Sequence, residues 1–274
     1  MENFVLIFCG HDRIEAVNPL KQLVIGTRLE RPTRAIYNRI LRGQEITEWD
    51  LRDARDSAYV RALLHKTLRV DSSCVDVGAH VGSFLCQILE FAPTGRHFAF
   101  EPIPELAEAL QENFSTVEVI SGALSDRAGE TSFQYVPELP AWSGFQKQPY
   151  PQDARPVTIP VAIMRLDDIV PREVPIKFIK IDVEGAELEV LRGSQETLKN
   201  CKPVVLFECA KIHHQNYSTS PEDVFDFFQR CGMGIFLMDE SGPLSVDEFV
   251  EVYQKSYLSN YDRSAWTNFL AMSV

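Results

Sequence analysis

Short apolar segments alternate with segments of helical periodicity from Ser73 onward, and this alternation constrains the fold more than any other feature of the chain. Two of the apolar segments, 176–181 and 203–207, are apolar almost throughout, which is typical of strands buried on both faces of a parallel sheet. The full set of predicted strands is 74–77, 97–100, 117–120, 176–181, 203–207, 235–238 and 269–272. Helices are predicted between them at about 81–92, 104–114, 184–199 and 221–231. This order predicts an α/β fold, a doubly wound and mostly parallel sheet with crossover helices on both faces.

The helix at 221–231 carries the clearest start signal. Ser220 is the expected N-cap, Pro221 stands at the first helical position, and Asp223 completes a capping-box pattern. We therefore expect this helix to begin at Pro221.

We predict two regions, an N-terminal extension over residues 1–70 and a main domain over 71–274. The extension is expected to contain short strands at 4–8 and 23–25 and a helical pattern from Thr33 to Leu68, and to pack on the main domain. Its function cannot be read from the sequence.

An excursion interrupts the main domain between about 130 and 165. Its flanks, 131–136 and 157–163, alternate like the two strands of a β-hairpin, and five prolines occur in the 20 residues from Pro137 to Pro156. The excursion is either a surface loop or a lid that lines a site, and the sequence leaves both open.

The composition of the chain excludes some classes of function. The chain has 274 residues with a net charge of −12 and no concentrated basic patch, so we do not expect nucleic acid as a partner. Its six cysteines lack the spacing of a metal site. The sequence has no apolar run long enough to span a bilayer, and its first residues do not have the pattern of a signal peptide. We expect a cytoplasmic protein with reduced thiols. The sequence leaves open whether it forms a homo-oligomer.

The strongest local signal runs from Val75 to Phe84. A strand ends near Asp76, a turn containing Gly78 and Gly82 follows, and a helix begins. We interpret the glycines as allowing the backbone to approach a ligand closely, and the helix N-terminus offers unpaired N–H groups to a carboxylate.

Glu101 ends the next strand, 25 residues beyond Asp76. A carboxylate at that place can accept hydrogen bonds from both hydroxyls of a ribose, so the two features together predict a nucleoside site. A dinucleotide fingerprint requires G-x-G-x-x-G, but here the glycines are Gly78 and Gly82, and His80 stands between them. The spacing therefore favours S-adenosylmethionine over NAD.

A third element, Lys180 to Glu187, follows another buried strand. Asp182 and Glu184 are expected at the same edge of the sheet as the first two sites, where ligands bind in such folds. The alternative is that Asp182 only caps a helix.

These residues resemble the FkbM-type methyltransferases. The resemblance runs from about Tyr59 to the end of the chain, and its most specific part is the string Lys-Ile-Asp-Val-Glu-Gly-Ala-Glu from Lys180. The other matching strings are Val75 to Phe84, Phe100-Glu101-Pro102, and Ala123-Leu124-Ser125-Asp126 with Gly129.

The resemblance implies a Rossmann-like class I methyltransferase fold, a seven-stranded sheet whose last strand is antiparallel. It also implies S-adenosylmethionine as methyl donor and a hydroxyl acceptor on a sugar or natural product, which makes the expected partner a small molecule or a glycan. The cofactor-binding residues expected from the motifs are Asp76, Gly78, Ala79, His80, Gly82, Ser83, Phe84, Glu101, Pro102, Ala123, Leu124, Asp126 and Asp182. By the resemblance, Asp76 and the glycines hold the methionine end, Glu101 the ribose, and Ala123, Leu124 and Asp126 lie beside the adenine.

An alcohol acceptor must lose its proton, and the candidate bases are Asp182, Glu184 and His213. Asp182, Glu184 and Glu208 could also gather a divalent cation, but paired acids alone do not establish a metal site, so none is predicted. Two alternatives remain open, an NAD(P)-dependent oxidoreductase and a non-catalytic nucleoside-binding module.

Overall fold

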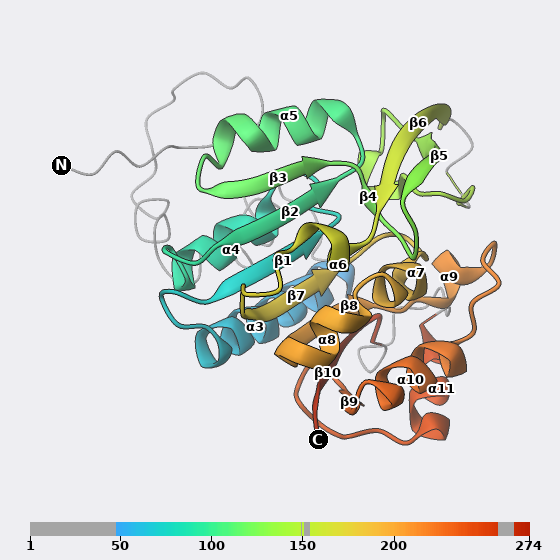
Figure 1. Cartoon of the computed structure of the whole chain (residues 1–274). Helices are drawn as coiled ribbons and strands as arrows, with labels where there is room; N and C mark the ends of the chain where they lie inside the picture. Colours follow the sequence, from blue (N-terminus) through green and yellow to red (C-terminus); the bar gives the residue numbers. More distant parts are fainter. Residues whose placement is uncertain (1–47, 149, 151–153, 257–265) are drawn as a thin grey trace, which may run out of the picture. The chain divides into compact units, whose positions relative to one another are not determined.

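The computed structural model describes residues 48–148, 150, 154–256 and 266–274 (Figure 1). The chain divides into two compact units, residues 1–58 and 59–274. Of the first unit the structure describes residues 48–58, which form the beginning of helix α3 (Glu48–Thr67). The strands predicted at 4–8 and 23–25, and the first part of the helical pattern from Thr33, lie outside the described residues.

The second unit is built on a sheet that, in the described residues, has seven strands in the order β3-β2-β1-β7-β8-β10-β9. Strand β10 is antiparallel to both of its neighbours, and the other adjacent strands are parallel. The strands are β1 (Ser73–Val77), β2 (His97–Glu101), β3 (Val117–Ser121), β7 (Ile176–Ile181), β8 (Val204–Glu208), β9 (Met233–Phe236) and β10 (Asn268–Ser273). The predicted fold class, including the antiparallel last strand, is confirmed.

Helices connect the parallel strands. From β1 the chain steps outward to β2 and β3, then returns to β7 on the other side of β1 and steps outward to β8. Right-handed crossovers in opposite directions place the connecting helices on opposite faces of the sheet. The longer helices are α4 (Ser83–Phe91), α5 (Pro104–Asn113), α10 (Pro221–Arg230) and α11 (Val246–Lys255), and the shorter ones are α6 (Leu166–Ile169), α7 (Glu187–Arg192), α8 (Gln195–Cys201) and α9 (Lys211–His214). None of the described helices is both long and apolar enough to cross a membrane.

The single helix predicted at 184–199 was wrong, because the structure has two helices there, α7 and α8. The first begins only at Glu187, since Glu184 and Gly185 have positive φ angles of 56° and 108° that end the strand in a turn. The break between the helices lies at Gly193, where an added Cβ would stand 2.0 Å from the carbonyl oxygen of Ser125. The two backbones pack so closely at the break that only glycine fits there.

Capping explains the helices at the end of the chain. The predicted capping box of α10 is confirmed, because Asp223 N–H donates to Ser220 Oγ and Ser220 N–H donates to the Asp223 carboxylate. Helix α11 was not predicted, although Ser245 and Glu248 form the same reciprocal pair at its start. The signal Ser-x-x-Glu was present in the sequence.

A smaller sheet, in the order β4-β6-β5, lies beyond the carboxyl ends of β2 and β3 (Figure 1). Its strands are β4 (Ala123–Leu124), β5 (Gly129–Tyr135) and β6 (Val157–Met164), and β5 pairs antiparallel with β6. A short 3-10 helix, η1 (Pro140–Trp142), follows β5. Ile103, which follows β2, packs in one apolar cluster with Phe133 and Val161 of this sheet. The small sheet is thereby attached to the edge at which a ligand is expected.

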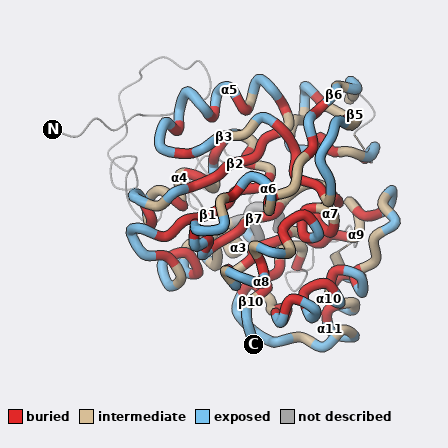
Figure 2. Tube along the Cα trace, viewed as in Figure 1, coloured by how far each residue is buried: buried red, intermediate tan, exposed pale blue. Residues whose placement is uncertain are grey.

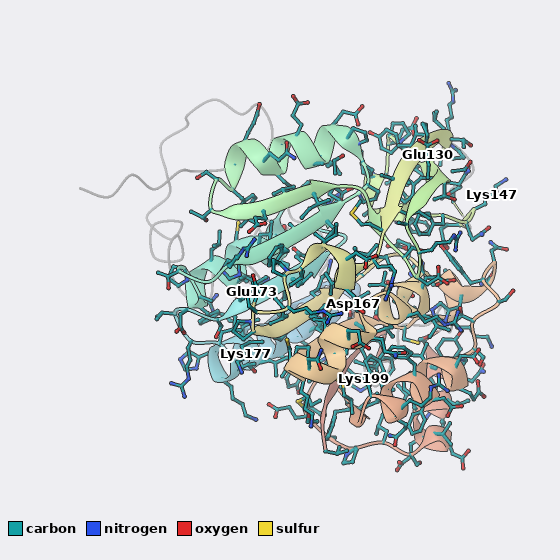
Figure 3. All side chains as sticks on the ribbon, in the orientation of Figure 1. Glu130, Lys147, Asp167, Glu173, Lys177 and Lys199 are labelled. Atoms are coloured by element: carbon teal, nitrogen blue, oxygen red, sulfur yellow. The ribbon has the colours of Figure 1, made fainter. Side chains whose placement is uncertain are left out.

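Burial follows the predicted pattern of apolar runs. Strands β1 and β2 are buried at every residue, and the central strands are drawn largely in red in Figure 2. Charged side chains such as Glu173, Lys177 and Lys199 are exposed (Figure 3). The polar side chains that are buried are therefore informative, and several of them lie at one edge of the sheet.

Candidate functional site

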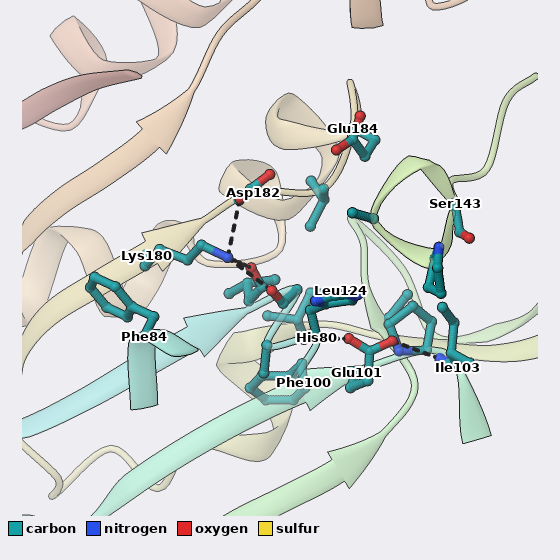
Figure 4. A pocket seen from close by; sticks show the side chains of 18 of the residues that line it. His80, Phe84, Phe100, Glu101, Ile103, Leu124, Ser143, Lys180, Asp182 and Glu184 are labelled. Atoms are coloured by element: carbon teal, nitrogen blue, oxygen red, sulfur yellow. Dashed lines mark hydrogen bonds and ion pairs between the residues drawn. The ribbon is translucent and has the colours of Figure 1, made fainter. Parts of the chain in front are cut away.

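A cavity of about 320 Å³ opens at the carboxyl ends of β1, β2 and β7 (Figure 4). One wall comes from the turn between β1 and α4, and another from the ends of β2 and β7. The hairpin sheet supplies the third wall, through Phe133, η1 and Phe145. The excursion predicted between 130 and 165 thus contributes side chains to the cavity.

The turn after β1 has a left-handed backbone at Gly78, His80 and Gly82, with φ angles of 75°, 49° and 77°. It is fixed to the neighbouring strand, because Gly78 N–H and Ala79 N–H both donate to the carbonyl oxygen of Phe100. Helix α4 then begins at Ser83, and its N-cap is Gly82, which has no side-chain oxygen to cap the first turn. Ser83 and Phe84 line the cavity, which places the positive end of the helix dipole at the cavity wall.

Packing inside the protein is a further reason for the two glycines of this turn, beside the predicted approach to a ligand. A Cβ on Gly78 would stand 2.0 Å from the carbonyl oxygen of Asp182, and a Cβ on Gly82 would stand 2.4 Å from the ring of Phe114. Both neighbours belong to the protein. The glycines therefore permit the turn to pack against β7 and α5, in addition to the positive φ that they accommodate.

Glu101 is the buried carboxylate at the end of β2. Its oxygens accept hydrogen bonds from His80 N–H at 2.7 Å and from Ile103 N–H at 2.9 Å. Burial raises the pKa of Glu101 to about 6, and the two backbone hydrogen bonds oppose the rise. A carboxylate has about four lone-pair positions, so Glu101 keeps acceptor capacity toward the cavity that it lines.

Lys180 of β7 connects the floor of the cavity to the turn. Its Nζ donates to the carbonyl oxygen of Gly78 at 2.8 Å and lies 3.4 Å from Asp182 Oδ2 and 3.6 Å from Asp76 Oδ1. Burial raises the pKa of Asp76 to about 6, although the ammonium of Lys180 lowers it. Burial lowers the pKa of Lys180, but Asp182 and Asp76 outweigh this and leave it above its ordinary value.

The turn after β7 brings a second group of charges to the edge. Glu184, which lines the cavity, forms an ion pair from Oε2 to His213 Nδ1 at 2.7 Å, and His213 Nε2 lies 3.7 Å from Glu208 Oε2. Burial lowers the pKa of His213, but its contact with Glu184 and the charge of Glu208 raise it to about 10. At neutral pH His213 is therefore an imidazolium held between two glutamates.

The structure gathers most of the predicted site residues around the cavity. Those that line it are Gly78, Ala79, His80, Ser83, Phe84, Glu101, Pro102, Ala123, Leu124, Asp182 and Glu184. The other predicted residues do not line it: Asp76 lies beneath Lys180, Gly82 packs on Phe114, His213 lies behind Glu184, and Asp126 pairs with Arg127.

Sequence reasoning did not assign a site role to Lys180. A lysine inside the apolar strand Ile-Lys-Phe-Ile-Lys-Ile was the available signal, because a cation in a buried strand needs a partner. It also missed Phe133 and Ile103, whose place depends on how the hairpin folds back over the sheet.

Glu184, Glu208 and His213 are also the residue types that hold divalent cations. Their ligand atoms lie within 4.8 Å of one another. Acidic groups gather in this way without an ion in many proteins, so the cluster by itself does not establish a metal site.

Comparison with known proteins decides the family. Residues 76–233 match the model of the methyltransferase FkbM domain. The chain belongs to the FkbM methyltransferase family. The matched segment begins at Asp76 and contains the turn, Glu101, the hairpin and the Lys180–Glu187 string, so the predicted family is confirmed from the residues that form the cavity.

Two curated relatives are 30% and 32% identical to the chain over the residues that align. Hexuronic acid methyltransferase AglP from Haloferax volcanii is 32% identical over 182 residues, 64% of this chain and 69% of AglP. Methyltransferase sdnD from Sordaria araneosa is 30% identical over 155 residues, 44% of this chain and 60% of sdnD. A crystal structure of methyltransferase FkbM from Methylobacillus flagellatus superposes with a TM-score of 0.44 at 18% identity, over 75% of this chain and 44% of that chain.

Proposed function

We propose that this FkbM-family chain is an S-adenosylmethionine-dependent methyltransferase that methylates a hydroxyl group of a sugar or natural product. The names of two relatives support this acceptor class. AglP is a hexuronic acid methyltransferase, and a protein 31% identical over 144 residues is the 2-O-methyltransferase NoeI of Sinorhizobium fredii. Both names describe transfer to a carbohydrate or to an oxygen, and they make sugars the first acceptor class to test.

The observation that carries the proposal is that the N-terminus of α4, whose N-cap is a glycine, and Glu101 line one cavity. The helix terminus suits the carboxylate of the methionine part, and Glu101 suits the ribose hydroxyls. Ala123 and Leu124 supply an apolar wall for the adenine. Asp126, whose carboxylate pairs with Arg127, is left out of the proposed set.

The charge of the cavity fits this cofactor. Glu101, Asp182 and Glu184 line it and Asp76 lies beneath, while Lys180 is the cation that lines it among the described residues. S-adenosylmethionine brings a sulfonium and an ammonium against a single carboxylate, so it offsets the negative charge. The pyrophosphate of NAD(P) would add anions to an acidic site, which argues against the oxidoreductase alternative.

We assign the proton-accepting role to Glu184. The residue lines the cavity, and burial raises its pKa while His213 opposes the rise. His213 already carries a proton at neutral pH, so its proposed role is to hold Glu184 in place. Asp182, with 44% of its side chain exposed, pairs with Lys180 and is the second candidate base.

When bound, S-adenosylmethionine supplies an electrophilic methyl group on a sulfonium. The protein would hold the acceptor oxygen in line for the transfer, an orientation effect that contributes roughly 7–11 kcal/mol in favourable cases. Transfer of the methyl group to that oxygen would leave a neutral thioether, and Glu184 would accept the proton that the acceptor loses. Acid–base assistance of this kind adds about 10²–10⁴-fold in rate.

The first test of the proposal is binding. Isothermal titration calorimetry should show that S-adenosylhomocysteine binds and NAD does not, and the opposite selectivity would refute the proposal. A panel of uronic acids and other sugar glycosides is then screened with methyl-labelled S-adenosylmethionine.

The second test locates the base. With the best acceptor from the panel, Glu184→Gln should lower kcat by about 10²-fold or more while binding of S-adenosylhomocysteine changes little. Glu196→Gln, an exposed glutamate of α8, is the control. If Asp182→Asn removes activity and Glu184→Gln does not, the base is Asp182.

A further inference from the structure

Glu187 is the first residue of α7, and 1% of its surface is exposed. Both oxygens of its carboxylate make contacts. Oε1 accepts hydrogen bonds from Val183 N–H at 3.3 Å and from Gly185 N–H at 3.1 Å. Oε2 lies 3.1 Å from Nε2 of His214. A glutamate that only favoured the dipole of its own helix would not contact the preceding turn, so these contacts fix residues 183–185.

The contacts continue beyond Glu187. Nδ1 of His214 lies 3.3 Å from the hydroxyl of Tyr253 on α11, and both side chains are buried. A His214 ring with its proton on Nε2 donates to Glu187 and accepts from the Tyr253 hydroxyl, so each polar atom in the chain of contacts has a partner. Helix α11 is in this way connected to the turn after β7.

The turn needs such support. Glu184 has a φ of 56°, a left-handed conformation that is strained for a residue other than glycine. At Gly185 a Cβ would stand 2.6 Å from the carbonyl oxygen of His213 and 2.6 Å from the ring of Tyr217. On the other side, Gln148 Nε2 donates to the carbonyl oxygen of Glu184 at 2.8 Å. The strained turn is thus held from two directions.

We propose that Glu187 is a positioning residue, which holds the turn 183–185 so that Glu184 meets His213 and faces the cavity, and that His214 and Tyr253 hold Glu187 in turn. Its catalytic consequence rests on the proposed function, in which Glu184 accepts the proton. The claim that Glu187 holds the turn does not rest on it, because that claim concerns only contacts within the chain.

The test uses Glu187→Asp in the full-length chain. Aspartate keeps the negative charge but is one methylene shorter, so it cannot reach the turn and His214 together. His213 is faced by Glu184 and Glu208 and, more weakly, by Glu187, and the charge at 187 is retained. As Glu184 moves away, the pKa of His213 should fall by about one unit or more in an NMR titration of ¹⁵N-histidine-labelled protein. Amide exchange at Gly185 should accelerate about tenfold.

The matched control is Glu189→Asp on the same helix, which should leave both readouts at their wild-type values. Tyr253→Phe, which changes no charge, should lower the pKa of His213 and accelerate exchange at Gly185 by smaller amounts. If Glu187→Asp does not fold, this variant tests the proposal. Wild-type titration of His213 and wild-type exchange at Gly185 in the folded variant would overturn the proposal. Failure of the wild-type chain to bind S-adenosylhomocysteine would instead refute the proposed function and leave the positioning result standing.

Discussion

The ammonium nitrogen of Lys180 lies 3.6 Å from Oδ1 of Asp76, a carboxylate with no exposed surface. Among the described residues, neither oxygen of Asp76 has a hydrogen-bond partner closer than this contact. The same ammonium donates to the carbonyl oxygen of Gly78. One side chain of β7 therefore compensates the buried charge of β1 and fixes the turn that forms the cavity wall.

Replacing Lys180 by methionine should lower the free energy of unfolding by about 3–5 kcal/mol, because it leaves the Asp76 charge buried without a partner. Urea denaturation at pH 8 measures the loss, which should shrink at pH 5, where Asp76 is protonated. Lys177→Met, at an exposed position of the same strand (Figure 3), is the control and should cost little. Equal costs for the two variants would show that the ion pair contributes no stability.

Glu101→Gln should weaken binding of S-adenosylhomocysteine by about tenfold, because the amide has a donor where the ribose hydroxyls need an acceptor. The amide also cannot accept both backbone hydrogen bonds that Glu101 receives from His80 and Ile103. Calorimetry compares this variant with Glu105→Gln, an exposed glutamate of α5. Unchanged affinity in Glu101→Gln would remove Glu101 from the proposed site.

The affinity for S-adenosylmethionine should rise from pH 5 to pH 7.5. Burial raises the pKa of both Asp76 and Glu101 to about 6, so both carboxyls are mostly protonated at pH 5 and ionised at pH 7.5. The sulfonium and ammonium favour the ionised forms, so binding should release protons and strengthen as pH rises through about 6. S-adenosylhomocysteine lacks the sulfonium charge and should show a weaker dependence. A flat profile for S-adenosylmethionine, measured by calorimetry, would contradict the proposed placement of these carboxylates.

The location of the site could be predicted because it follows from topology. Apolar runs identified the parallel strands, and the carboxyl ends of adjacent parallel strands meet at one edge. Asp76, Glu101 and Asp182 therefore fall near one another wherever the connecting helices lie. Local signals were also enough to predict the start of α10, because its capping box lies within four consecutive residues.

The remaining features depend on contacts between segments distant in sequence. The link from Tyr253 through His214 to Glu187 joins α11 to α7, and no periodicity indicates it. The glycine at the break, Gly193, is likewise required by the close approach of Ser125, 68 residues earlier. A local pattern cannot encode such approaches, which is why the helix at 184–199 was predicted as continuous.

Gly82 offers a test of why glycine stands in the motif. Its φ is 77°, and an added Cβ would meet the Phe114 ring, whereas Gly232 has a φ of 71° and nothing within 4 Å of an added Cβ. Gly232→Ala should therefore cost only the backbone strain, about 1 kcal/mol, and Gly82→Ala about 1–3 kcal/mol more through overpacking. Urea denaturation measures both.

In a Phe114→Ala background the added cost of Gly82→Ala should fall toward that of Gly232→Ala, because the ring that obstructs the Cβ most closely is gone and Leu110 Cδ2, at 2.9 Å, remains. If Gly82→Ala instead destabilises no more than Gly232→Ala and only weakens binding of S-adenosylhomocysteine, then the glycine is kept for the ligand, as the motif alone had indicated, and the packing explanation is wrong.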